Sequence, residues 1–366
     1  MDIHHPVGEW ALDPQGVHLN HGSYGGITRA MFARAAELHA RLEAAPMKFF
    51  VLDWQGLIDE ARAAVAEFVH APVADTVFVP SATTGVAIAI HSCEVGPGDD
   101  IVTTDHSYRA VKNQLLRRGG NVITVPLALP FEPDAFVASI LAAITPRTRL
   151  VVLDHVTSAT AIVFPLERIV PQLVARGIQV VIDGAHAPGQ IELDVGKLGA
   201  TFYTGNHHKW LCAPKASGFL VGKTARPIVT SHGASPEYGP ANRLHAELDW
   251  SGTYDPTSQL CAPLFTQQTR EVRERNHALA LAFADAIGGR RLAPDSSLGA
   301  MVAMPLKLRP GVDPLAIREQ LLRDNWEVML VDWRGQQLLR VSTHLYNSLE
   351  DAPRLLAKLH QLGVSL

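Results

Sequence analysis

The segment QVVIDGAHAPGQIELDVGKLGATFYTGNHHK, residues 179–209, contains two apolar runs that each lead into polar residues. The first run closes at Asp183. The second, at 200–203, precedes a polar stretch that ends at Lys209. Short β-branched runs without polar alternation are typical of strands that are covered on both faces. The segment therefore predicts two buried strands with polar side chains at their carboxyl ends.

The same pattern extends through residues 76–222, where helix-length segments such as 108–118 and 165–176 separate most of the apolar runs. The seven runs lie at 76–79, 101–103, 122–125, 150–153, 180–182, 200–203 and 218–221. This alternation predicts an α/β domain with a seven-stranded, mostly parallel sheet. The connection between the last two runs is short, which favours an antiparallel pair.

The rest of the chain predicts two further parts. We assign residues 1–25 to an N-terminal arm, 26–256 to the large domain and 257–366 to a smaller α+β domain. The small domain is expected from a long helix and three strands, at 267–286, 301–308, 327–331 and 338–342. A stretch rich in Gly, Pro and Ser, 231–256, precedes it.

Composition is that of an ordinary globular protein. Hydrophobic residues make up 47% and charged residues 19% of 366, which disfavours disorder. The net charge of −4 argues against a nucleic-acid partner. No run of 18 apolar residues predicts a membrane span, and the polar start lacks the apolar stretch of a signal peptide. We therefore expect a cytoplasmic protein.

Neither a disulfide framework nor a metal site is predicted. The cysteines, Cys93, Cys212 and Cys261, have no paired spacing, and the 17 histidines form no H-E-x-x-H motif. We therefore expect no metal ion.

Polar or glycine residues directly follow five of the predicted strands. They are SATTG at 81–85, DH at 105–106, DH at 154–155, DGAH at 183–186 and GNHHK at 205–209. Open α/β sheets bind ligands at the carboxyl ends of their strands. We therefore expect the functional site at this edge of the sheet.

A lysine and an aspartate at such an edge suit pyridoxal 5′-phosphate (PLP). This cofactor forms a Schiff base with an amine, and a carboxylate keeps its pyridine nitrogen protonated. Lys209 and Asp183 are the candidates, and Lys215, in a turn-like APK sequence, is the local competitor for the amine. Asp183 could equally cap a turn or a helix.

Three other features could serve the same site. The segment 81–85 joins a strand to a helix and could bind a phosphate, although Ser and Thr are also ordinary helix caps. His106 and Tyr108 both offer a ring to stack on the pyridine. Arg340 interrupts an apolar run, so its charge needs either a substrate carboxylate or an internal ion pair.

Taken with further motifs, these residues resemble the class V aminotransferase family of PLP enzymes, which has the type I fold, and within it the isopenicillin N epimerase-like proteins. The matching motifs span almost the whole chain in order: LNHGSYG at 19–25, TDHSY at 104–108, DHVTS at 154–158 with FP at 164–165, DGAH at 183–186, residues 204–220, WSGTYDP at 250–256, RVS at 340–342 and YN at 346–347.

The resemblance implies a role for each matching residue. Lys209 would hold PLP covalently, Asp183 would bind its pyridine nitrogen, and His106 would stack on the ring. The remaining cofactor contacts would come from Thr83, Thr84, Asn206 and His208 at the phosphate and from Ser158 and His186 near the ring hydroxyl.

The resemblance also implies substrate contacts and a shared site. Arg340 would bind the substrate carboxylate, and a loop over the substrate would include Asn20, His21 and Tyr24. Gly252 and Thr253 would reach the cofactor phosphate of a neighbouring subunit, which implies a homodimer.

For function, we expect chemistry at Cα of an amino-acid or small-peptide substrate, with Lys209 moving the proton. Epimerisation needs a second proton donor on the opposite face, for which Tyr24, His21 and Tyr108 are candidates. β-Elimination by a C–S lyase and transamination use the same lysine.

Three other functions are disfavoured. Residues 327–339 contain no cysteine, which disfavours the persulfide transfer of a cysteine desulfurase. A purely regulatory or structural role would not need both Lys209 and Asp183. A nucleotide-binding enzyme would need a glycine-rich motif such as G-x-G-x-x-G, which does not follow any predicted strand.

Overall fold

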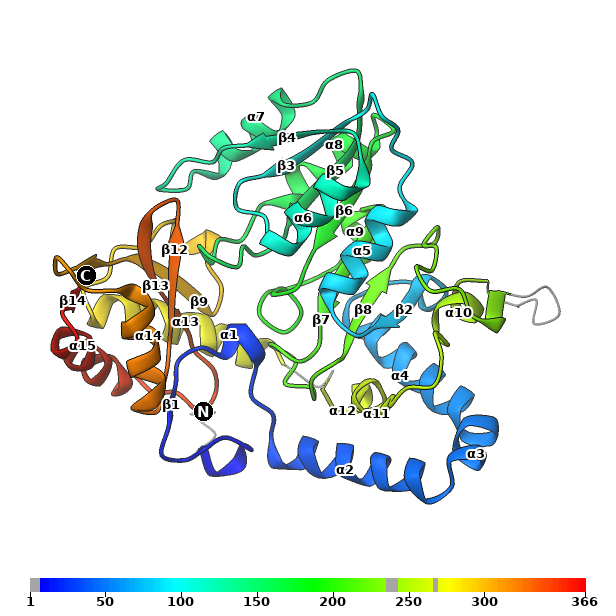
Figure 1. Cartoon of the computed structure of the whole chain (residues 1–366), viewed down its shortest axis with the longest axis horizontal. Helices are drawn as coiled ribbons and strands as arrows, with labels where there is room; N and C mark the ends of the chain where they lie inside the picture. Colours follow the sequence, from blue (N-terminus) through cyan, green and yellow to red (C-terminus); the bar gives the residue numbers. More distant parts are fainter. Residues whose placement is uncertain (1–6, 235–242, 266–268) are drawn as a thin grey trace.

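A computed structural model describes residues 7–234, 243–265 and 269–366, and its central element is a seven-stranded sheet (Figure 1). The strand order is β2-β8-β7-β6-β5-β3-β4, and every neighbouring pair is parallel except those that involve β8. This confirms the predicted α/β sheet and its one antiparallel connection. The strands are β2 (Thr76–Val79), β3 (Asp100–Thr104), β4 (Asn121–Val125), β5 (Thr148–Asp154), β6 (Gln179–Asp183), β7 (Phe202–Asn206) and β8 (Gly218–Val221).

Two separate hydrophobic cores cover the faces of this sheet, which explains its continuous apolar runs. Alternate residues point into opposite cores, as do Val181 and Phe202 on one face and Ile182 and Tyr203 on the other. Against one face pack α5 (Ala82–Ser92), α6 (Arg109–Arg118) and α10 (Arg243–Leu248). Against the other pack α4 (Trp54–Phe68), α7 (Pro133–Ala142), α8 (Val170–Val174) and α9 (Val195–Leu198).

The N-terminal segment lies against the small domain before the chain enters the large one (Figure 1). Its strand β1 (Val17–His18) pairs in parallel with β11 (Trp326–Glu327), and Asn20 forms an isolated bridge with Ser342. The short helix α1 (His21–Tyr24) follows. The chain then continues through α2 (Arg29–Ala44), α3 (Pro46–Lys48) and the π-helical turn Phe49–Asp53.

The C-terminal part has its own antiparallel sheet, of order β12-β13-β9, and a second two-stranded sheet of β10 and β14. Its elements are α13 (Arg270–Ala286), β9 (Met301–Pro305), β10 (Lys307–Leu308), α14 (Pro314–Arg323), β12 (Met329–Trp333), β13 (Gln336–Ser342), α15 (Asp351–Gln361) and β14 (Val364–Ser365). The short helices α11 (Thr257–Leu260) and α12 (Ala262–Phe265) precede it. Among the described residues, no helix has the length and apolar character to cross a membrane.

A buried ion pair fixes the segment that leads from the large domain toward α11. The guanidinium of Arg62, on α4, is fully buried and bonds both carboxylate oxygens of Asp249 at 3.0 and 2.6 Å. The Tyr254 hydroxyl, five residues further on, donates to Gln259 Oε1 at 2.9 Å. These contacts fix one end of the segment 249–254 to α4 and the other end to α11.

Replacing Arg62 with Ala should lower the free energy of unfolding by about 3–5 kcal/mol, because Asp249 is then left buried without its counterion. Urea denaturation followed by circular dichroism measures the loss. The matched control is Arg34→Ala, which breaks an exposed pair with Glu37 and should cost about 1 kcal/mol or less. Equal losses in the two variants would contradict a stabilising role for the buried pair.

Candidate active site

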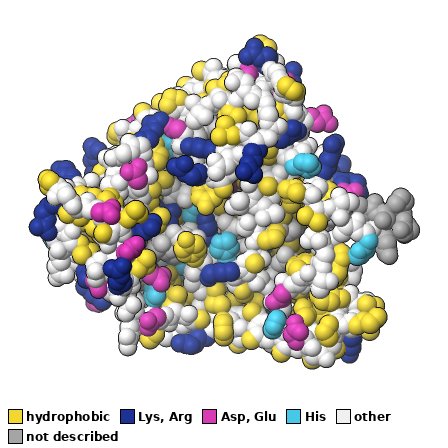
Figure 2. Space-filling model, viewed as in Figure 1, with side chains coloured by type: hydrophobic (Ala, Val, Ile, Leu, Met, Phe, Trp, Pro, Cys, Tyr) yellow, Lys and Arg dark blue, Asp and Glu magenta, His cyan; other side chains and the backbone are white. Residues whose placement is uncertain are grey.

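A cavity of about 280 Å³ opens at the carboxyl edge of the sheet, where the large domain, the N-terminal turn and the small domain meet. In Figure 2, basic and histidine side chains lie at the hollow between the small domain, at the left, and the large domain. The lining residues are Ser23, Tyr24, Ser81, Ala82, Thr83, Tyr108, Asp154, Val156, Ser158, Asp183, Ala185, His186, Asn206, His208, Lys209, Met329 and Arg340. The predicted strand ends therefore do converge on one site.

Lys209 lies in the turn after β7, with its Nζ 3.0 Å from His186 Nε2. Burial and the charge of Arg340 lower the pKa of Lys209 to about 7, while Asp183 opposes the shift. Burial also holds the pKa of His186 well below its usual range, so a neutral ring lies beside the lysine. A substantial fraction of Lys209 is therefore a free amine near neutral pH, as a nucleophile or a base requires.

Two carboxyl groups stand side by side at this edge, because Asp154 ends β5 and Asp183 ends β6 in direct register. Asp183 Oδ1 accepts the Ala185 N–H at 3.0 Å. Burial raises the pKa of both groups, and the charge of Asp183 raises the pKa of Asp154 further. Since Lys209 favours the ionised form of Asp183, the pKa of Asp154 is raised more than that of Asp183.

The N-terminus of α5 forms a polar cradle beside these residues. Ser81 caps the helix by accepting the Thr84 N–H, and Asn206 Oδ1 accepts the Ala82 N–H at 2.8 Å. A Cβ at Gly85 would collide with Thr204 Oγ1, so glycine lets the first turn press against β7. The first turn of this 11-residue helix therefore faces the cavity, with its dipole favouring an anion.

Arg340 is a buried cation that bonds only neutral acceptors in the described structure. Its guanidinium donates to the Ser158 carbonyl at 2.6 Å, to Asn20 Oδ1 at 3.0 Å and to Ser23 Oγ at 2.6 Å. Burial lowers its pKa to about 10, so it stays charged at neutral pH. A buried charge of this kind favours an anionic ligand in the cavity.

Several predicted site residues do not reach the cavity. His106 is buried elsewhere, with Nδ1 bonded to Thr160 Oγ1 at 2.8 Å and its ring 4.7 Å from that of Trp333. The loop turns after β3, where Thr103 Oγ1 bonds Ser107 Oγ at 2.7 Å, so Tyr108 lines the cavity instead. Tyr108 therefore lines the cavity and His106 does not, and which of the two rings stacks on a ligand stays a prediction.

Thr84, Gly252 and Thr253 also lie outside the described lining of this cavity. The Thr84 side chain borders a second cavity together with Tyr254. Gly252 has a positive φ of 121°, which favours glycine, and Thr253 is exposed.

His21 is the clearest departure from expectation, because it points away from the cavity. Only 2% of His21 is exposed, whereas 74% of Tyr24 in the same short helix is exposed. Its nitrogens bond the Tyr346 hydroxyl and the main-chain carbonyl of Lys209. His21 is therefore unavailable to a substrate, while Tyr24 and Asn20 remain beside Arg340.

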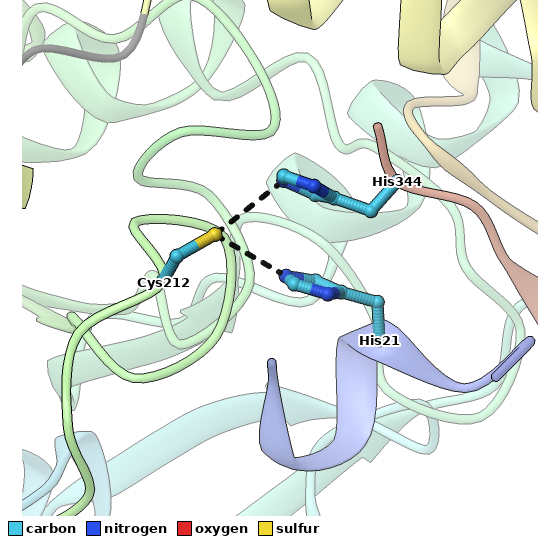
Figure 3. A group of neighbouring side chains, drawn as sticks. All are labelled: His21, Cys212 and His344. Atoms are coloured by element: carbon cyan, nitrogen blue, oxygen red, sulfur yellow. Dashed lines mark hydrogen bonds between the residues drawn. The ribbon is translucent and has the colours of Figure 1, made fainter. Parts of the chain in front are cut away.

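His21 does belong to a group of possible metal ligands with Cys212 and His344, whose ligand atoms lie within 4.8 Å of one another (Figure 3). Two features argue against a metal ion there. The rings of His21 and His344 are stacked at 4.0 Å with an 18° angle, so their in-plane lone pairs run nearly parallel and do not converge. His21 Nε2 is also engaged with a carbonyl, which accepts only and so requires a proton on that nitrogen.

Several lining residues have no role that the sequence predicts. Asp154 stood at a predicted strand end, and that signal could have placed it in the site. Ser23 lay inside the LNHGSYG motif. Met329 and Val156 carry no chemical signal, and only the folded chain brings them to the cavity.

Comparison with known proteins identifies the family. The class V aminotransferase model matches residues 38–232, more than half of the chain. The chain belongs to this family. Isopenicillin N epimerases from Amycolatopsis lactamdurans and Streptomyces clavuligerus are each 32% identical to it, over 96% and 95% of both chains, respectively. A putative L-cysteine desulfhydrase 1 from Oryza sativa subsp. japonica is 31% identical, over 92% of this chain and 81% of the relative.

Solved structures confirm the fold. The cystine C–S lyase C-DES, in complex with cysteine persulfide, superposes with a TM-score of 0.80 at 21% identity, covering 95% of this chain and 98% of that one. The cysteine desulfurase CsdA from Escherichia coli gives 0.78 at 19% identity, covering 97% and 96%. The predicted type I fold is therefore confirmed, and the family identifies the cofactor as PLP, as predicted.

Unpartnered buried atoms around the cavity are consistent with PLP. Within the described chain, His186 Nδ1, His208 Nδ1 and Arg340 Nε have no hydrogen-bond partner. Buried donors are costly when unpaired. The phosphate and the ring oxygen of PLP would offer partners to the two histidines, and the carboxylate of a substrate would offer one to Arg340.

Replacing Lys209 with Ala should abolish the cofactor adduct that borohydride fixes, because no other described lysine lines the cavity. Peptide mapping of the reduced protein by mass spectrometry measures this. Lys215→Ala is the matched control and should retain the adduct, since Lys215 Nζ instead donates to the Gly25 carbonyl at 3.2 Å. An adduct at Lys215 in the first variant would overturn the assignment.

Proposed function

We propose that this chain is a PLP-dependent enzyme that acts at Cα of an amino-acid or small-peptide substrate, with an outcome like that of isopenicillin N epimerase. One observation carries the proposal. The same cavity is lined by a lysine with a pKa lowered to about 7, by an aspartate and by an arginine that bonds no carboxylate in the described chain. These are the three charges that PLP and an α-amino acid require.

Each residue around the cofactor has a task. Lys209 attaches it, Asp183 keeps its pyridine nitrogen protonated, and Tyr108 takes the stacking position first given to His106. When bound, PLP supplies an electron sink for the bond that breaks at Cα. The N-terminus of α5 holds the phosphate with Thr83 and His208.

Two further residues serve the cofactor from the other side of the cavity. His186 and Ser158 are the donors for the ring oxygen. His186 Nε2 lies 3.0 Å from Lys209 Nζ, whereas its Nδ1 has no partner in the described chain and is the ring nitrogen left for the cofactor.

Arg340 orients the substrate by binding its α-carboxylate. Its guanidinium is already held in place by Ser158, Asn20 and Ser23, so little side-chain entropy is lost on binding. With the carboxylate held there, the Cα–H bond is presented to Lys209, whose free amine takes the proton.

A homodimer with shared sites is part of the proposal. Gly252 and Thr253 do not reach the cavity of their own chain, and Arg62 and Asp249 hold their segment in a defined position. Ile228 and Val229 expose 51% and 56% of their surface beside this segment, at a second cavity of about 300 Å³. Apolar exposure of this kind favours coverage by a second subunit, whose cofactor phosphate Thr253 would then bind.

Epimerisation requires a proton donor on each face of the substrate. Lys209 serves one face. Of the three candidates for the other, Tyr24 and Tyr108 line the cavity, whereas His21 does not. A tyrosine hydroxyl in this position could return a proton to the face opposite the lysine.

β-Elimination is the second candidate, since it needs Lys209 alone, and the L-cysteine desulfhydrase relative of rice favours it. A persulfide mechanism is disfavoured. Cys93, Cys212 and Cys261 are all buried, and burial raises the pKa of each thiol above its usual range.

Replacing Arg340 with Ala should raise KM for carboxylate substrates by roughly tenfold or more, because a bond to a charged group contributes about 1.5–3 kcal/mol. Steady-state kinetics measure this. The matched test uses the carboxamide form of the substrate, for which wild type and variant should differ much less. An unchanged KM for the carboxylate would remove Arg340 from the site.

The outcome at Cα should be visible when the holoenzyme is incubated in D₂O with a panel of amino acids and small peptides. We expect deuterium at Cα together with the opposite enantiomer, because reprotonation on both faces exchanges the proton with solvent. Mass spectrometry measures the deuterium content of the recovered substrate, and chiral chromatography measures its enantiomer ratio. Loss of substrate to a keto acid without racemisation would instead establish the lyase or a transaminase.

A further inference from the structure

The turn that carries Asn20, Ser23 and Tyr24 has two faces with different surroundings. Ser23 and Tyr24 line the cavity, whereas His21 and Gly22 are buried on the opposite side, against the turn that carries Lys209. The proposed mechanism uses the first face and leaves the second without a role. His21 is the polar group on that second face.

The hydrogen bonds of His21 define one tautomer. The Lys209 carbonyl, 3.0 Å away, accepts only, so Nε2 must carry the proton. Nδ1 is then the acceptor, and the Tyr346 hydroxyl donates to it at 2.9 Å. Burial lowers the pKa of His21 to about 3, which keeps the ring neutral at any working pH.

The contact is part of a close fit between the two turns. The Lys209 carbonyl also accepts the Cys212 N–H at 3.1 Å, so both of its lone pairs are used. A Cβ at Gly25 would collide with the His208 carbonyl, and Gly25 has a positive φ of 67°. Only glycine therefore lets the end of the N-terminal turn approach this main chain.

The same ring also joins the small domain. His21 stacks on His344 at 4.0 Å, and Cys212 Sγ lies 3.8 and 3.6 Å from the Nε2 atoms of the two rings (Figure 3). His344 follows β13, the strand that carries Arg340. The lysine, the N-terminal turn and the arginine strand thus meet at one buried cluster.

We propose that His21 is a positioning residue for Lys209: by donating from Nε2 to the lysine carbonyl, it sets the direction in which the side chain leaves its turn. The inference rests on the proposed function, in which Lys209 moves the Cα proton. Because the bond acts through the main chain, its loss should slow the chemical step and leave carboxylate binding at Arg340 intact.

Three variants of the holoenzyme test this. His21→Leu removes the donor, His21→Gln places an amide N–H near the position of Nε2, and His344→Leu removes the stacked partner without touching the Lys209 carbonyl bond. We expect His21→Leu to lower kcat about tenfold with KM changed by less than about twofold. It should also shift the pH at which the change in cofactor absorbance is half complete, by about half a pH unit or more.

His21→Gln should restore most of both values, and His344→Leu should lower Tm while leaving kcat within about twofold of wild type. Equal losses of kcat in the two leucine variants, or no recovery with glutamine, would overturn the proposal, because general packing would then explain the effect.

A second measurement needs neither turnover nor cofactor. In ¹⁵N NMR spectra of the histidine-labelled protein, the His21 signal is the one that His21→Leu lacks. This signal should show the Nε2–H tautomer and should not titrate from about pH 5 to about pH 9. The opposite tautomer or a titration in that range would refute the bond. If the proposed function failed, borohydride would fix no cofactor at Lys209 in the wild type, and this spectrum would be unchanged.

Discussion

The site depends on two basic side chains in a buried cavity, a lysine that can still gain a proton and an arginine that stays charged. Burial disfavours both charges: it lowers the pKa of Arg340 to about 10, and together with the charge of Arg340 it lowers the pKa of Lys209 to about 7. Asp183 limits the shift on the lysine, while neutral oxygens surround the arginine. This separation lets the lysine lose its proton near neutral pH while the arginine stays charged.

The fold supplies those charges from elements far apart in the chain. Parallel strands bring Asp183 and Asp154 into register, and the turn after β7 adds Lys209. The arginine comes from the small domain and is held by the N-terminal turn through Asn20 and Ser23. Loss of any one segment would leave a buried charge without its hydrogen bonds, so the site and the domain arrangement stabilise each other.

Sequence patterns predicted the parts of the site that lie at strand ends, because the sheet geometry forces those residues to one edge. This rule predicts that the cavity is lined by Lys209, Asp183, Thr83 and His208. His106 and Tyr108 could not be separated, because they lie two residues apart in an irregular loop. Only the contacts with Thr160 and Trp333 turn one ring into the core and leave the other at the cavity.

The sequence by itself determined the seven-stranded α/β sheet, its antiparallel connection, the family and the cofactor, since each depends on local periodicity or on short motifs in order. The tertiary structure alone decided that His21 faces away from the cavity and bonds the Lys209 main chain. It also decided that Arg340 forms no ion pair with a carboxylate in the described chain. Burial and hydrogen-bond partners arise from segments hundreds of residues apart, as with His21 and Tyr346, and local pattern carries no information about such contacts.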